Sequence, residues 1–422
     1  MSVRWFTTLS FAFVLGSWLA APASAYSVLT HEAIIDSAWP NELRPLLLER
    51  FPNATVDQLR DAHAYAYGGA IIQDMGYYPF GSKFFSDLVH YTRSGDFVLA
   101  LLKDARESGD INDYAFALGA LAHYAADNLG HPVAVNRTVP LVYPKLRAKF
   151  GSEITYEDNP AAHLKTEFGF DVVEIARGQY ASEAYHDFIG FQVAKPLLER
   201  AFKETYCVEL KDLFGNLDLA LGTYRFTVSQ ILPEMTQTAW SANKKAIETL
   251  QTGITRRRYV YRISMAAYQK DWGNQYRRPG FGARFLGFLF RLMPKIGPFK
   301  ALSFKVPPPA AEKLFLTSLD ETIRSYRELL AAVREDRLQL VNENFDTGRP
   351  ARFGDYRLAD EAYAKLLERL EGTPASISEQ LRANVLAFYG SSGSPASDKA
   401  RAVLTALRAS LSANPGPYQG HD

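Results

Sequence analysis

The stretch Tyr114-Ala-Phe-Ala-Leu-Gly-Ala-Leu-Ala-His123-Tyr-Ala-Ala-Asp127-Asn-Leu-Gly-His131 is the most informative part of this sequence. Its alanines, leucines and aromatic residues predict an α-helix over residues 114–129, and Asp113 is placed to cap its start. His123, Asp127 and His131 follow at intervals of four residues. Because a helical turn takes about 3.6 residues, we expect these three side chains on one helix face.

Helical patterns also dominate the rest of the chain. Asn159-Pro160 predicts another helix start, with asparagine as the N-cap and proline in the first turn. Apolar residues recur at spacings of three and four within residues 210–240, 310–337 and 359–370. Strand signals are scarce and no internal repeat is apparent, so the sequence predicts an all-α fold.

Several polar residues sit where only a strong partner would make their burial favourable. The predicted helix face is otherwise apolar, and a divalent cation is a suitable partner because imidazole and carboxylate are zinc ligands. His163 and Glu167 repeat the four-residue spacing, and Asp74 and His90 add further donors. A lone histidine is more often a hydrogen-bonded core residue. Two spaced pairs on two helices favour a metal site.

The first 25 residues have the features of an export signal. Arg4 precedes an apolar run over residues 6–20, and Ala23-Ser24-Ala25 is a small-x-small cleavage pattern. A membrane helix is the alternative, but the apolar run is short for one and ends at Pro22. We therefore expect cleavage after Ala25 and an exported protein, periplasmic or secreted.

Cleavage would create a further metal donor at the new N-terminus. The free amine of Tyr26 would lie five residues before His31. An α-amino group has a pKa of about 7.7 to 8.0, so a metal ion displaces its proton easily near neutral pH. The amine and carbonyl of Tyr26 can then chelate one ion, with His31 beside them.

Cysteine content and charge add two further constraints. Cys207 is the only cysteine, so we expect a fold held by its core, by bound metal, or by both. The net charge is +1, yet residues 256–305 hold twelve Lys or Arg against one acid. The apolar and basic residues of 284–305 suit an anionic membrane surface. A core helix pair with a basic edge and attraction to nucleic acid are the alternatives.

The candidate metal-binding residues described above, from Tyr26 to Glu167, together resemble those of the superfamily of zinc-dependent bacterial phospholipases C and fungal single-strand nucleases. The resemblance spans about 140 residues in the superfamily's order and ends by about residue 250. Two positions depart from the family pattern. Tyr26 stands where the family usually has tryptophan, and His131 lies four residues beyond Asp127 instead of six.

The resemblance implies a multi-helix catalytic domain with three zinc ions. The first ion would be held by Asp74, His90, His123 and Asp127; the second by His131, His163 and Glu167; and the third by the Tyr26 amine and carbonyl, His31 and a bridging Asp127. Asp74 would also be the general base. His63 and His186 have no ligand role in this set.

The resemblance favours a phospholipase C, with phospholipid as substrate and no stable nucleic-acid complex. The His163-x-x-x-Glu167 pair supports this choice, since the nucleases tend to have aspartate at the second position. A nuclease and a non-enzymatic zinc-binding periplasmic protein are the alternatives. Tyr77, Tyr78 and Phe80 are candidates for lipid contact or for the core.

The predicted organisation has five parts. They are a signal peptide (1–25), a catalytic domain (26–255), a basic apolar segment (256–309), additional C-terminal helices (310–412) and a disordered tail (413–422). The oligomeric state does not follow from the sequence.

Overall fold

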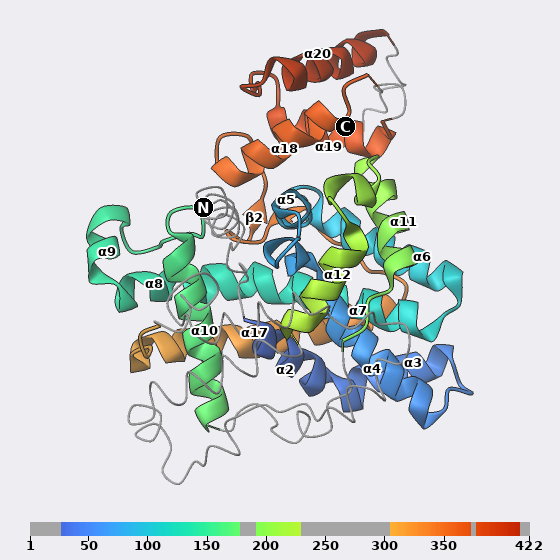
Figure 1. Cartoon of the computed structure of the whole chain (residues 1–422), viewed down its shortest axis with the longest axis vertical. Coiled ribbons are helices and arrows are strands. Elements are labelled where there is room, and N and C mark those ends of the chain that lie inside the picture. Colours follow the sequence, from blue (N-terminus) through green and yellow to red (C-terminus); the bar gives the residue numbers. More distant parts are fainter. Residues whose placement is uncertain (1–26, 178–190, 229–303, 373–376, 414–422) are drawn as a thin grey trace, which may run out of the picture.

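The structure is a computed structural model that describes residues 27–177, 191–228, 304–372 and 377–413. Regular structure in these ranges is almost entirely helical (Figure 1), which confirms the predicted all-α class. The predicted signal peptide, Tyr26, most of the basic segment, His186, and the tail after Ala413 lie outside the described residues. No helix in the described ranges has the length and apolar character needed to cross a bilayer.

The helices of the first half follow one another with short connections. In chain order they are α2 (Val28–Ala38), the π-helical turn η1 (Trp39–Leu43), α3 (Arg44–Arg50), α4 (Val56–Ile71), the 3-10 turn η2 (Ile72–Tyr77), α5 (Lys83–Tyr91), α6 (Ser94–Ser108), α7 (Ile111–Leu129), the π-helical turn η3 (Gly130–Val135), α8 (Asn136–Val142), α9 (Pro144–Phe150) and α10 (Pro160–Arg177).

The second half adds helices and one small hairpin. These are α11 (Lys195–Tyr206), the 3-10 turn η4 (Leu210–Leu213), α12 (Leu217–Phe226), α17 (Pro309–Arg334), the antiparallel strands β1 (Glu343–Asn344) and β2 (Arg349–Pro350), α18 (Arg357–Arg369), α19 (Glu379–Tyr389) and α20 (Asp398–Ala413). Figure 1 shows α18, α19 and α20 gathered at one end of the molecule.

Helix ends follow local capping chemistry. Asn159 caps α10 as predicted, since its Oδ1 accepts a hydrogen bond from the Ala162 N–H at 2.9 Å. The predicted cap Asp113 is wrong: α7 starts earlier, because Asp110 has extended backbone angles and accepts from the Asn112 N–H. The apolar spacing from residue 210 corresponds to two elements in the described part, η4 and α12, because Asn216 caps a separate helix there.

The centre of the fold is the pair α4 and α7. A Cβ atom on Gly69 would lie 2.0 Å from the Phe116 carbonyl oxygen, and one on Gly119 would lie 2.1 Å from that of Ala66. The two backbones therefore touch, and only glycine permits this approach. On another side of α7, the Tyr326 hydroxyl of α17 donates to the Leu118 carbonyl at 2.9 Å.

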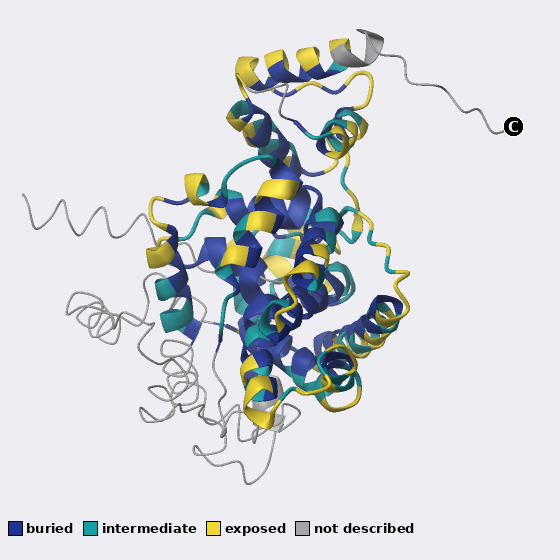
Figure 2. Cartoon of the chain, turned by 90° about the vertical axis from the view of Figure 1, so that its right-hand side faces the viewer, coloured by how far each residue is buried: buried dark blue, intermediate teal, exposed yellow. Residues whose placement is uncertain are grey.

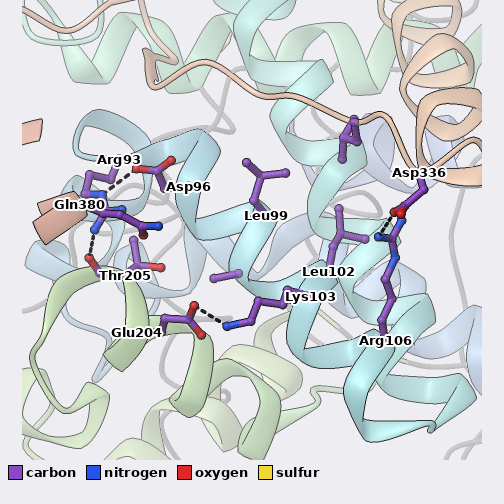
Figure 3. A pocket seen from close by; sticks show the side chains of 12 residues that line it. Arg93, Asp96, Leu99, Leu102, Lys103, Arg106, Glu204, Thr205, Asp336 and Gln380 are labelled. Atoms are coloured by element: carbon purple, nitrogen blue, oxygen red, sulfur yellow. Dashed lines mark hydrogen bonds and ion pairs between the residues drawn. The ribbon is translucent and has the colours of Figure 1, made fainter. Parts of the chain in front are cut away.

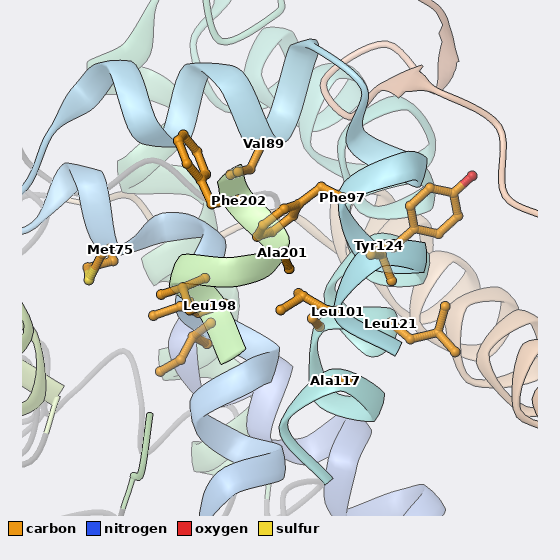
Figure 4. Close-up of a cluster of buried hydrophobic side chains, with 14 of the residues drawn as sticks. Met75, Val89, Phe97, Leu101, Ala117, Leu121, Tyr124, Leu198, Ala201 and Phe202 are labelled. Atoms are coloured by element: carbon orange, nitrogen blue, oxygen red, sulfur yellow. The ribbon is translucent and has the colours of Figure 1, made fainter. Parts of the chain in front are cut away.

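Apolar side chains from distant parts of the chain form one core. Figure 4 shows Phe97 and Leu101 of α6 beside Leu198 and Phe202 of α11. The same cluster extends to residues of α17–α20. The helices bury their inner faces and expose their outer ones (Figure 2), as expected for amphipathic helices around a common core.

Candidate metal centre

Four elements bring five of the predicted ligands to one buried place. The helix α2 carries His31, the turn η2 carries Asp74, α5 carries His90, and α7 carries both His123 and Asp127. Each of these side chains is at most 3% exposed. Burial of so many ionisable groups together requires strong mutual interactions or a bound cation.

Asp127 lies at the middle of this first group. Its Oδ2 is 3.1 Å from His123 Nε2 and 3.5 Å from His90 Nε2, and its Oδ1 is 3.5 Å from His31 Nε2. His90 Nε2 is in turn 3.3 Å from Asp74 Oδ1. The set His31, His123 and Asp127 and the set Asp74, His90 and His123 each have donor atoms within 4.8 Å of one another.

Backbone carbonyls orient two of these imidazoles. His90 Nδ1 lies 2.8 Å from the Ser86 carbonyl oxygen, and His123 Nδ1 lies 2.9 Å from that of Ala70. Each Nδ1 therefore donates its proton to the backbone, so that Nε2 is the nitrogen that faces Asp127. This tautomer is the one that metal-binding histidines adopt when their other nitrogen is hydrogen-bonded.

The second group consists of His131, His163 and Glu167, whose donor atoms also lie within 4.8 Å of one another. His163 Nε2 contacts the Ile154 carbonyl oxygen at 2.5 Å, so Nδ1 faces the group, 3.6 Å from Glu167 Oε1. All three side chains are buried.

The position of His131 corrects one prediction. We expected His131 on the same α-helical face as His123 and Asp127, but α7 ends at Leu129 and His131 lies in the π-helical turn η3. Pro132 follows directly and has no N–H for an α-helical hydrogen bond. This turn moves His131 into the second group, with His163 and Glu167.

The hydrogen bonding of the buried donor atoms indicates whether a metal ion fits between them. Within the described residues, both Asp127 oxygens, Nδ1 of His131 and of His163, and Oε1 of Glu167 are buried without a hydrogen bond. Each such atom costs about 1 to 3 kcal/mol when it has no partner. A cation among them would remove this cost, and imidazole with carboxylate is a donor set that suits zinc.

Electrostatics in the first group are set by competition between burial and neighbouring charges. Burial lowers the pKa of His90, but Asp127 and Asp74 outweigh it and raise the pKa to about 10. Burial and the nearby His123 lower the pKa of His31 to about 4. Burial raises the pKa of Asp127, yet the surrounding histidines bring it well below its usual value. Asp127 is therefore the stable anionic centre of the group.

Two acidic residues near the site were not identified from the sequence. Asp171 continues the spacing of His163 and Glu167 by one more turn, a signal that could have revealed it. Its carboxylate accepts hydrogen bonds from the Leu29 N–H at 3.2 Å and the Thr30 hydroxyl at 2.7 Å. It thus ties α2, and with it His31, to α10.

The other missed residue, Asp346, has no motif that could have revealed it. It lies in the turn between β1 and β2, and its Oδ1 is 3.2 Å from His131 Nδ1. The residue is 1% exposed.

Other polar and aromatic candidates have structural surroundings. His63 Nε2 is 3.1 Å from Asp36 Oδ1, and its ring stacks on Trp39 with centroids 3.7 Å apart. Tyr77 and Tyr78 are buried in the core, which favours the core alternative for them. Phe80 is 49% exposed.

A cavity of about 490 Å³ lies against α6 and α11, and none of the predicted ligands lines it (Figure 3). Its charged side chains pair with neighbours: Arg93 with Asp96 at 2.7 Å, and Lys103 with Glu204 at 2.7 Å. These pairs leave little reason to assign it a charged ligand, so the two buried donor groups are the candidate site.

Comparison with known proteins supports a metal-dependent assignment. Neither the curated proteins nor the solved structures included a match to this chain. Residues 30–216, however, match the family model described as zinc dependent phospholipase C. The matched range contains every predicted ligand except Tyr26 and ends well before Asp346. The match over residues 30–216 supports the zinc-dependent phospholipase C family, and with it a zinc-dependent hydrolase of phosphoric diesters.

Proposed function

We propose that this protein is an exported phospholipase C that hydrolyses the phosphodiester of phospholipids. The observation that carries the proposal is the convergence of buried donor atoms around Asp127 and around Glu167, within the part of the chain that matches the family. The family description supports a phospholipid substrate. The apolar and basic composition of residues 284–305 supports peripheral contact with a membrane, although only residues 304 and 305 of this segment are described.

The proposed ligands are distributed over three zinc ions. One ion would be held by Asp74, His90, His123 and Asp127, one by His131, His163 and Glu167, and one by Tyr26, His31 and the other oxygen of Asp127. When bound, zinc lowers the pKa of water from 15.7 toward about 7 and neutralises charge that develops on phosphoryl oxygens.

The residues of the chain have distinct tasks in this proposal. The carbonyls of Ala70 and Ser86 keep His123 and His90 in one tautomer, so that their Nε2 atoms face the site. Asp74 is the proposed general base, which accepts a proton from the water that attacks phosphorus. The bond from phosphorus to the glycerol oxygen then breaks, and that oxygen takes up the proton from Asp74 to leave as the hydroxyl of diacylglycerol, which releases the phosphorylated headgroup.

The decisive experiment uses the chain that begins at Tyr26. We expect it to contain zinc and to release phosphorylated headgroup from phosphatidylcholine vesicles. Release of nucleotides from single-stranded DNA without headgroup release would instead identify a nuclease. Bound zinc with neither activity would identify a zinc-binding protein. The Asp74→Asn variant tests the base, because near-normal turnover with full zinc content would exclude that role.

The N-terminal ligand has its own test. A chain that retains residues 1–25 has no free amine at Tyr26, so we expect it to bind one zinc ion more weakly than the chain that begins at Tyr26. Equal zinc stoichiometry and affinity in the two chains would exclude the Tyr26 amine as a ligand.

A further inference from the structure

The carboxylate of Asp346 reaches the second donor group from outside the part of the chain that matches the family. Its Oδ1 is 3.2 Å from His131 Nδ1, yet neither atom makes a hydrogen bond to a described residue. Both atoms are therefore buried polar atoms that lack a hydrogen bond and lie within reach of one shared partner. His163 Nδ1 and Glu167 Oε1 have the same relation at 3.6 Å. This arrangement is the one expected of donors that share an ion.

The other oxygen of Asp346 is fully used in holding the carboxylate in place. Oδ2 accepts a hydrogen bond from the Tyr156 N–H at 2.9 Å and another from the Tyr356 hydroxyl. Carboxylates that bind metals are typically oriented in this way by hydrogen bonds to the oxygen that does not ligate. Oδ1 is therefore fixed toward His131.

The backbone around Asp346 is equally well anchored. The Asn136 side-chain amide donates to the Asp346 carbonyl oxygen at 2.7 Å, and the Asp346 N–H donates to Asn344 Oδ1 at 3.0 Å. The Phe345 N–H donates to the His90 carbonyl oxygen at 3.1 Å. These contacts join the hairpin turn to α8, which follows η3, and to α5, which carries His90.

The backbone of the hairpin turn at Gly348 lies very close to the backbone at the junction of α7 and η3. Gly348 has a φ of +62°, and a Cβ atom there would lie 2.8 Å from the Asn128 carbonyl oxygen. Any other residue would be both strained and crowded at this position. Glycine at this position therefore allows the turn to pack against the segment that carries Asp127 and His131.

We infer that Asp346 is a fourth protein ligand of the zinc ion held by His131, His163 and Glu167. The inference rests on the zinc site of the proposed function and deepens it. Two imidazoles and two carboxylates would give this ion four protein ligands, and a closed site with four protein ligands is the arrangement of zinc ions with a structural role. The activation of water is then the task of the group around Asp127. The second ion instead links the C-terminal region to the catalytic helices.

The isosteric variant Asp346→Asn tests this directly in the mature full-length chain. The donors Tyr156 and Tyr356 will take the amide oxygen, so the NH2 group, which cannot ligate, faces His131. We expect zinc at this group to be lost to a competing chelator at least about tenfold more readily than in the unmodified chain. The exposed Asp355→Asn variant is the matched control and should behave like the unmodified chain.

A second variant gives a positive signal that does not depend on lost affinity. In Asp346→Cys loaded with cobalt, a thiolate at this position should produce an intense thiolate-to-cobalt charge-transfer band in the near ultraviolet. The unmodified chain and Asp355→Cys should lack the band. Absence of the band in a folded Asp346→Cys chain, or unchanged zinc retention in Asp346→Asn, would overturn the ligand role.

These measurements separate this inference from the proposed function. If the unmodified chain binds zinc and releases headgroup while Asp346→Asn keeps every zinc ion, only the role of Asp346 fails. If the unmodified chain binds no zinc, the proposed function fails and the role of Asp346 fails with it.

Discussion

Asp127 shows how much of the proposed chemistry depends on one side chain. Its two oxygens face three imidazoles between 3.1 and 3.5 Å away, and it is fully buried. The same carboxylate keeps the pKa of His90 raised. A single anion in this position serves as a bridge between donor sets, because each oxygen faces a different side of the group.

We predict that Asp127→Asn loses zinc from the first group and slows headgroup release by about 100-fold or more. The asparagine amide is neutral, and its NH2 group cannot coordinate a metal ion. Zinc content by elemental analysis and vesicle turnover check this, with Asp57→Asn on the exposed face of α4 as the control. Full zinc content with normal turnover would exclude the bridging role.

The pH dependence of zinc binding at the second group follows from Glu167. Burial raises the pKa of its carboxyl to about 7. Only the ionised carboxylate ligates, so affinity is complete above this pKa and falls as the pH decreases through it. We predict that protonation of this carboxyl weakens the affinity by up to about tenfold for each pH unit below 7. The affinity is measured by competition between a chelator and the Asp127→Asn variant, which retains only the second group. A constant affinity from about pH 7 to pH 5.5 would contradict the prediction.

At the scale of elements, α7 combines the ligand face with a close backbone contact to α4. One face carries His123 and Asp127, while Gly119 lets α4 approach backbone to backbone. The separation of α4 and α7 also matters for the site, because the Ala70 carbonyl of α4 orients His123.

We predict that Gly119→Ala lowers the free energy of unfolding by about 2 to 3 kcal/mol, because the new methyl group meets the Ala66 backbone at 2.1 Å. Denaturant unfolding measures the change. Gly222→Ala on α12, where an added Cβ atom meets nothing within 4 Å, is the matched control and should be neutral or slightly stabilising. Equal free energies of unfolding of the two variants would show that α4 and α7 can accommodate the added methyl group without loss of stability.

At the scale of the whole molecule, the C-terminal helices α17–α20 belong to the same core as the helices that carry the predicted ligands, here called the catalytic helices. Phe315 of α17 stacks on Phe170 of α10 with ring centroids 4.4 Å apart, and Tyr326 is fully buried. The family match ends at residue 216, but the hydrophobic core does not end there.

We therefore predict that a chain ending at residue 308 does not form a stable native state. It lacks the apolar face of α17 that covers α7 and η3 and packs on Phe170 of α10, and burial of that face contributes about 25 cal/mol per Å² of apolar surface. Thermal unfolding followed by near-ultraviolet circular dichroism compares it with the full chain. A cooperative transition at the temperature of the full chain would show that the catalytic helices fold alone.

Local patterns in the sequence determined the helical class, the start of α10 and the donors on α7 and α10. Capping, helical periodicity and the four-residue spacing of His163 and Glu167 act within one or two turns, so they can be read without knowing the fold. The same reasoning wrongly extended the α-helical face to His131 and wrongly assigned the cap of α7 to Asp113. The free-energy difference between a π-helical and an α-helical turn, or between two capping aspartates, is small.

Local sequence patterns do not determine which donors share a group; the family resemblance suggested the grouping, and the tertiary structure produces it. His31, Asp74 and His90 come from separate elements, and only packing against α7 places them around Asp127. Asp346 shows the limit most clearly. It lies 215 positions beyond His131, and nothing in its neighbouring residues distinguishes it. Its place depends on α17 and the hairpin packing on the catalytic helices, since contacts between distant residues are set by the shared core and not by local sequence.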